Sequence, residues 1–165
     1  FLNAGRCIKR NRFDDAVARH YRTLEAIAQY FLYEVGIDNE KPDYSRLTQS
    51  QIDLFKSVLR GNTEEEKSLP QKIDLKLGFW LLNVIEHPVK DLVFKGKKSF
   101  KEFTFEGILL ERNSSILAHG FKPIGKERAE RFHTQLQELL ENAFIEDYDN
   151  IKRKLQLPTM PEIGF

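Results

Sequence analysis

The sequence predicts an all-α fold, a bundle of about five or six helices. Apolar residues recur at steps of three and four in several long segments, which is the helical period. Few segments alternate apolar and polar residues as strands do. The chain has 165 residues, of which 41% are hydrophobic and 31% charged, enough for one domain with a real core.

The first strong element is a long helix over residues 13–35. Asp14 and Asp15 lie in its first turn, where the helix dipole favours anions, and Gly36 is a suitable C-terminal stop. Residues 2–10 are read as the tail of a preceding helix. The apolar face of the long helix consists of Phe13, Val17, Tyr21, Leu24, Ala28, Phe31, Leu32 and Val35.

Two shorter helices are predicted next. Thr48 with Gln51 forms a capping-box pattern, which opens a helix that we expect to end at Gly61. Residues 75–85 are almost continuously apolar, so we expect a buried helix there that stops before Pro88.

The segment over residues 89–103, VKDLVFKGKKSFKEF, is basic and is broken by Gly96. We expect a short exposed helix or a solvated loop. Its lysines could also bind RNA phosphates, with Phe100 or Phe103 stacking on a base.

Two more helices are predicted in the C-terminal third. One spans residues 105–120, with Gly120 at its end, and the other spans residues 126–144. A last short helix is expected over residues 147–157. The apolar positions of the first two are Ile108, Leu109, Ile116 and Leu117, followed by Phe132, Leu136, Leu139, Leu140 and Phe144.

The overall composition excludes several classes of protein. Lysine plus arginine total 26 and aspartate plus glutamate 25, so any nucleic-acid site must be a local patch. The single cysteine, Cys7, excludes an intrachain disulfide and a cysteine-based zinc site, and it fits a reducing cytoplasm. No apolar run approaches the length of a membrane span, so we expect a cytoplasmic protein with no membrane partner. Because the first residue is Phe1, we expect a chain cut from a longer one or one whose start is disordered.

The stretch RNSSILAHG carries the most suggestive chemistry. Arg112 and His119 are seven residues apart, which places them about 20° apart around a helix axis and about 10 Å apart along it. Asn113 adds an amide with both donors and acceptors. One helix face therefore offers a permanent cation and a group that titrates near neutrality.

These groups suit RNA cleavage with no metal or other cofactor. The 2′-hydroxyl attacks the adjacent phosphorus, and an imidazole with a pKa of about 6.5 can take its proton or protonate the leaving oxygen. A guanidinium stabilises the charge on the phosphorane through forked hydrogen bonds. Two copies across a two-fold axis would supply both an acid and a base.

The same stretch matches the Arg-x4–6-His motif of HEPN ribonuclease domains. RFDDAVARHYRTLEAIAQ also resembles the first long helix of the HEPN half of certain CRISPR-associated proteins, ancillary nucleases of type III systems. In those proteins an N-terminal CARF domain binds a cyclic oligoadenylate and activates the nuclease. The resemblance extends from about Ala4 to the helix ending near Phe144.

The resemblance implies a helical, homodimeric, metal-independent endoribonuclease of antiviral defence, with its active site at the dimer interface. It implies that Arg112 and His119 are the catalytic pair and that Asn113 supports them, with Ser115 as a neighbouring candidate. No Gly-rich loop or βα pattern precedes Phe13, so a cyclic oligoadenylate would act only through a missing N-terminal domain. Residues 1–12 would be the linker or last helix of that domain, and residues 13–165 the HEPN domain.

Four further cations follow the motif and could extend a positive rim around the scissile phosphate, although such charges occur on any exposed helix face. They are Lys122, Lys126, Arg128 and Arg131.

Structural alternatives remain for the motif itself. Arg112 could pair with Glu111 or another acid, and His119 could cap the last carbonyls of its helix. The domain could then be a non-catalytic nucleotide-binding, RNA-binding or dimerisation module. A toxin-like HEPN nuclease outside CRISPR immunity is a further alternative.

The other three histidines are expected to be structural. We expect His20 to be a partly buried packing residue, His87 to cap a helix, and His133 to be exposed. None of them has metal-ligand spacing with another histidine or with the cysteine.

Overall fold

The computed structural model describes residues 1–59, 68–95, 99–114 and 123–144. Within these ranges the fold consists of α-helices and one 3-10 helix, without strands, which confirms the all-α prediction. The elements are α1 (Leu2–Lys9), α2 (Phe13–Glu34), α3 (Gln49–Lys56), α4 (Leu75–Val84), α5 (Val89–Phe94), η1 (Phe100–Glu102), α6 (Glu106–Ser114) and α7 (Lys126–Ala143).

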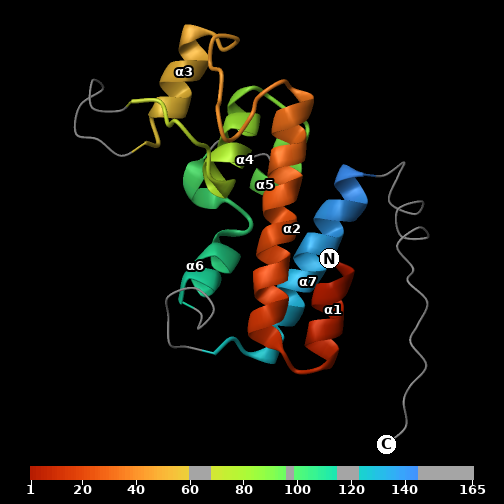
Figure 1. Ribbon diagram of the computed structural model, residues 1–165. Helices are drawn as coiled ribbons and strands as arrows, with labels where there is room; N and C mark the ends of the chain where they lie inside the picture. Colours follow the sequence, from red (N-terminus) through yellow and green to blue (C-terminus); the bar gives the residue numbers. More distant parts are fainter. Residues whose placement is uncertain (60–67, 96–98, 115–122, 145–165) are drawn as a thin grey trace, which may run out of the picture.

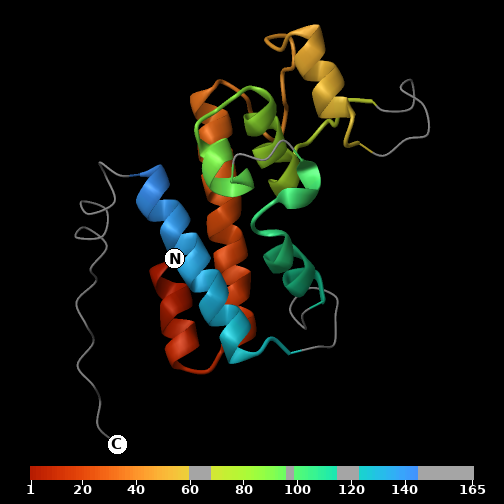
Figure 2. The same ribbon diagram turned by 180° about the vertical axis from the view of Figure 1, so that it is seen from behind.

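Helix α2 is the scaffold of the bundle. It packs against α1, α4, α6 and α7. Figure 1 shows α1 and α7 on one side of α2 and α6 on the other, and the view from behind agrees (Figure 2). The buried face recurs every three or four residues, as the periodicity predicts: Ala16, Val17, His20, Leu24, Ile27, Ala28, Phe31 and Leu32.

The ends of α2 and α3 follow the predicted signals. Gly36 has a φ of 77°, a left-handed conformation that favours glycine, and the backbone N–H of Ile37 donates to the Leu32 carbonyl at 2.8 Å. The Thr48 hydroxyl accepts from the Gln51 backbone N–H, and the Gln51 side chain accepts from the Thr48 N–H. Helix α3 ends at Lys56, earlier than predicted.

Helix α3 stands at the edge of the described bundle (Figure 1). Its main packing partner is α4, and Phe55 is its one buried side chain. Helix α4, in contrast, is buried at eight of its ten residues, as the apolar run predicts, and the Asp74 carboxylate caps it by accepting from the Leu77 N–H at 2.9 Å.

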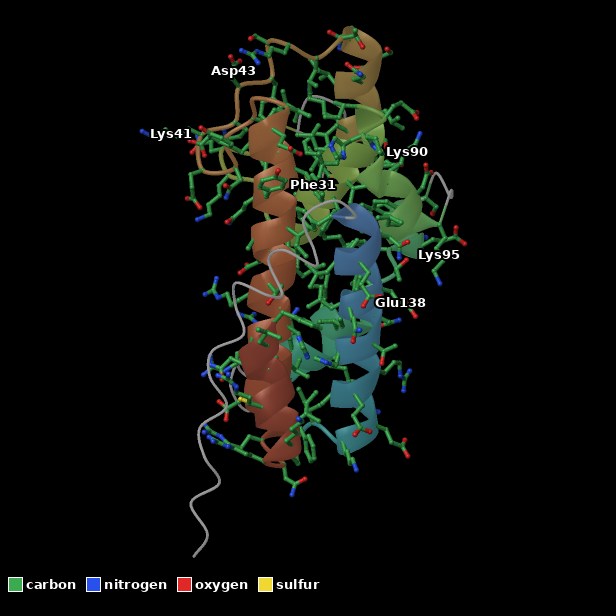
Figure 3. All side chains as sticks on the ribbon, turned by 90° about the vertical axis from the view of Figure 1, so that its right-hand side faces the viewer. Phe31, Lys41, Asp43, Lys90, Lys95 and Glu138 are labelled. Atoms are coloured by element: carbon green, nitrogen blue, oxygen red, sulfur yellow. The ribbon has the colours of Figure 1, made fainter. Side chains whose placement is uncertain are left out.

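A short helix, one of the two predicted forms, follows Pro88, but the prediction that it is exposed is wrong. Helix α5 starts there, and its Val89, Val93 and Phe94 are buried. The lysine-rich composition concealed this arrangement, because exposed lysines such as Lys95, directly after the helix, accompany the buried apolar residues (Figure 3).

Helix α1 is an integral part of the packing. Ala4 is fully buried and Cys7 is 6% exposed, and the helix contacts both α2 and α7. Among the described helices, none has the combination of length and hydrophobicity that a bilayer span requires.

Candidate active site

Arg112 lies in the last turn of α6, on the side that faces α2. Ile108, one turn earlier, is 1% exposed and anchors the helix in the core. The Arg112 guanidinium carbon sits 4.6 Å from the centroid of the Tyr21 ring, which belongs to α2. This is a cation–π contact, and it holds the cation against the scaffold helix. Asn113, the next residue, accepts a hydrogen bond from Arg112 Nη1 at 3.1 Å.

Two ion pairs fix α6 at its ends. In the first turn, the Glu106 carboxylate lies 2.6 Å from Lys76 Nζ of α4. In the last turn, the Glu111 carboxylate binds Arg128 Nη1 of α7 at 2.5 Å. Adjacent residues of one turn thus reach different neighbours, because Glu111 contacts α7 while Arg112 contacts α2. The C-terminal end of α6 is therefore held by contacts with two helices, α2 and α7.

The chain is anchored again just before α7. The backbone N–H of Ile124 donates to Asp14 Oδ2 at 3.4 Å, and Ile124 itself is 5% exposed. Asp14 and Tyr21 are seven residues apart on α2, or about 10 Å along its axis. His119, Ser115 and Lys122 fall in residues 115–122, outside the described residues. Both described ends flanking that segment therefore lie against the N-terminal half of α2.

The other candidate RNA-binding residues lie in the first turns of α7. Lys126 is exposed and sits 3.8 Å from the Glu130 carboxylate. Arg131 is exposed as well. Arg128 is engaged with Glu111, so part of its charge is neutralised within the protein. The positive rim expected from the sequence is thus partly compensated.

Tyr21 has an electrostatic environment that keeps its phenol neutral. Its burial, followed by the nearby Glu25 carboxylate, raises the pKa of Tyr21, and the Arg112 cation only partly opposes this. The contact with Arg112 is therefore one between a cation and a neutral ring rather than an ion pair.

A second polar contact joins α2 to α7 away from Arg112. His20 Nε2 and His133 Nδ1 are 3.3 Å apart, and the Phe1 ring stacks on His133 with centroids 4.6 Å apart. His20 is fully buried, and this burial, with the neighbouring His133, lowers the pKa of His20 to about 3. Burial also lowers the pKa of His133. His133 is half-buried, so the prediction that it is exposed is wrong.

His87 lies between α4 and α5, and its Nδ1 accepts from the Val89 N–H at 3.2 Å, so its contact is at the start of α5 and not at the end of the helix before Pro88. Within the part of the chain that the structure describes, no three His, Cys, Asp or Glu side chains converge as metal ligands.

Of the two phenylalanines that the sequence suggests for stacking on a base, only Phe100 is accessible at the surface. Phe103 is 3% exposed and belongs to the core, so it cannot stack on a base. Phe100 lines an open groove beside Trp80, and Lys76 Nζ lies 4.1 Å from its ring centroid.

Comparison with known proteins adds one finding to this geometry. No curated protein matches the chain. The family model described as the Csm6 HEPN domain matches residues 1–143, a span that runs from α1 to the end of α7. The chain therefore belongs to the Csm6 HEPN family, and it is a HEPN domain of a CRISPR-associated protein.

Proposed function

We propose that this chain is a metal-independent endoribonuclease that cleaves single-stranded RNA by attack of the 2′-hydroxyl on the adjacent phosphorus. Domains of this family are in general ribonucleases. The observation that carries the proposal is the placement of Arg112, half-buried at the end of α6, with its guanidinium on Tyr21 and Asn113 beside it.

Each motif residue has a distinct role in this proposal. Arg112 binds the scissile phosphate and stabilises the charge of the phosphorane, because a guanidinium donates paired, charge-assisted hydrogen bonds. His119 takes the proton of the 2′-hydroxyl or returns one to the leaving 5′-oxygen. Asn113 and Ser115 orient the phosphate. The products are a 2′,3′-cyclic phosphate and a 5′-hydroxyl, and the net proton count is unchanged.

The proposal includes a homodimer, because the motif of one copy supplies a single imidazole, that of His119, for two proton transfers. Leu110 supports this part. It lies on α6 next to Glu111 and Arg112, and it is 62% exposed. An apolar side chain so exposed beside the motif is suited to burial against a second copy.

We propose that the nuclease acts in the cytoplasm, in antiviral defence. Its proposed regulation needs a preceding domain that binds a cyclic oligoadenylate. Such a domain would be joined to α1, which packs on α2 and α7. A shift of α1 would therefore reach the helix that carries Tyr21.

The test is cleavage of a 5′-labelled single-stranded RNA in EDTA by the parent, His119→Ala and Arg112→Ala. Lys41→Ala is the matched control, because Lys41 is exposed near the other end of α2 (Figure 3). We expect the parent and the control to cleave and leave a cyclic phosphate, and both motif variants to lose activity. Equal cleavage by His119→Ala, or products ending in a 3′-hydroxyl, would reject the mechanism. RNA binding without cleavage by the parent would favour a non-catalytic binding module.

A further inference from the structure

We propose that Tyr21 is the positioning residue that holds the Arg112 guanidinium in its working orientation. The inference rests on the proposed phosphate-binding role of Arg112. It assigns to α2 a direct part in the site, through a ring that contacts the cation and not the substrate.

The rigidity of the ring's attachment is the first argument. Tyr21 follows His20, which is fully buried, and precedes Leu24, also fully buried, by one turn. Because α2 packs against four other helices, the backbone at Tyr21 has little room to shift. A long arginine side chain can adopt many rotamers, and a fixed ring on a neighbouring helix selects among them.

The kind of contact is the second argument. With 4.6 Å between guanidinium carbon and ring centroid, the pair lies within the range of a cation–π contact. A carboxylate in the same place would take up the N–H donors that a phosphate needs. A ring instead contacts the face of the guanidinium. The N–H donors of the guanidinium point outward in its own plane, away from the ring.

The ring, and not the hydroxyl, is the part that this role requires. The neighbouring Glu25 carboxylate is paired with Arg22 at 2.6 Å. The Tyr21 phenol is protonated near neutral pH, since its ordinary pKa of 10.0 is raised further by burial and by Glu25. A phenylalanine should therefore perform the same task.

The docking of α6 does not depend on this contact alone. Ile108 is buried in the core, and Glu106 and Glu111 make ion pairs to α4 and α7. Removal of the Tyr21 ring should therefore remove this contact with the Arg112 guanidinium, and so loosen its orientation, without displacing the helix. The expected loss is in the rate of the chemical step rather than in folding.

The experiment compares Tyr21→Phe and Tyr21→Leu, with Tyr30→Leu as the matched control because Tyr30 is a 47% exposed tyrosine of the same helix. Circular dichroism checks that every variant folds. We expect Tyr21→Phe and the control to keep kcat within about threefold of the parent, and Tyr21→Leu to lose at least about tenfold in kcat with a smaller change in KM. A folded Tyr21→Leu variant with the parent's kcat would overturn the proposal.

A second readout is independent of activity. The Arg112 Nε–H resonance, assigned by its disappearance in Arg112→Lys, should carry a ring-current shift that persists in Tyr21→Phe and vanishes in Tyr21→Leu. An unchanged resonance in Tyr21→Leu would overturn the positioning role. If the parent cleaves no RNA while the resonance shifts as expected, the proposed function fails and the placement of Arg112 by Tyr21 stands.

Discussion

The Arg128 guanidinium of α7 binds the Glu111 carboxylate of α6 at 2.5 Å, one residue before the proposed phosphate-binding Arg112. The sequence suggests an RNA-binding role for Arg128, whereas the contact suggests a clamp that holds the end of α6. The two roles predict different results for a charge exchange.

The first prediction concerns this clamp. Arg128→Ala should destabilise the fold by no more than about 1 kcal/mol, because the pair is partly solvent-exposed. Exchange of the two charges in the double variant Glu111→Arg, Arg128→Glu should restore most of the cleavage rate that Arg128→Ala loses. Urea unfolding and RNA cleavage measure both effects, with the exposed Lys41→Ala as the control. If Arg128 acts by binding RNA, the exchanged variant will be as defective as Arg128→Ala.

The second prediction concerns pH. The folded pKa of His20 is about 3, below its ordinary value of 6.5, so the unfolded chain takes up the proton first as the pH falls. The contribution of His20 is thus complete above about pH 6.5 and is lost progressively toward pH 3. Urea unfolding should show a less stable protein at pH 5 than at pH 7.

In His20→Leu the stability difference between pH 5 and pH 7 should shrink. His87→Leu serves for comparison, since the pKa of His87 is lowered by burial while Glu34 opposes the shift. An unaltered pH dependence in His20→Leu would mean that His20 is not the titrating group.

The third prediction concerns association. Leu110→Glu places a charge at the exposed apolar position of α6 and should convert a dimer to monomers, as measured by light scattering at micromolar concentration. Leu54→Glu is the control, because Leu54 is a 47% exposed leucine on α3, away from the motif helix. A monomeric parent, or a dimer unaffected by Leu110→Glu, would contradict an interface through α6.

The fourth prediction concerns the end of α2. Gly36→Ala should destabilise the protein by about 1 kcal/mol, because the left-handed φ is unfavourable for alanine. The added methyl group would also meet the Arg46 guanidinium, although that side chain can move aside. Gly107→Ala is the control, since Gly107 is helical and its nearest neighbour would be Phe132 at 4.0 Å. Thermal unfolding should show a lower Tm for the first variant and no loss for the second.

The elements that the sequence reveals are those encoded by local periodicity. Helix α2 follows its apolar repeat from Phe13 to Glu34, and the capping box at Thr48 marks the start of α3. The burial of α5 could not be predicted, because six residues are too few to establish a period and the lysines of the surrounding segment mask three buried positions. The end of α3 at Lys56 also departs from the glycine signal at Gly61.

The candidate site likewise has a part that the sequence predicts and a part that it does not. The spacing of Arg112 and Asn113 from His119 is local, so the motif is visible in the sequence. The residues that contact α6 are not visible in the sequence, because they come from other segments of the chain. Tyr21 reads as one more position of an apolar stripe, and nothing local pairs Glu111 with Arg128. The contact of His20 with His133 spans 113 residues and has no sequence signal.

The edge position of α3, with Phe55 as its one buried side chain, sets it apart from α2 in local stability. Its backbone amides should exchange with deuterium by local opening, whereas those of α2, held by four helices, should exchange only when the whole domain unfolds. A fluorescent label on exposed Asp53 would therefore report the opening of α3 while the helices around Arg112 stay closed. Asp53 should therefore be a labelling site whose motions are independent of those of the proposed catalytic end.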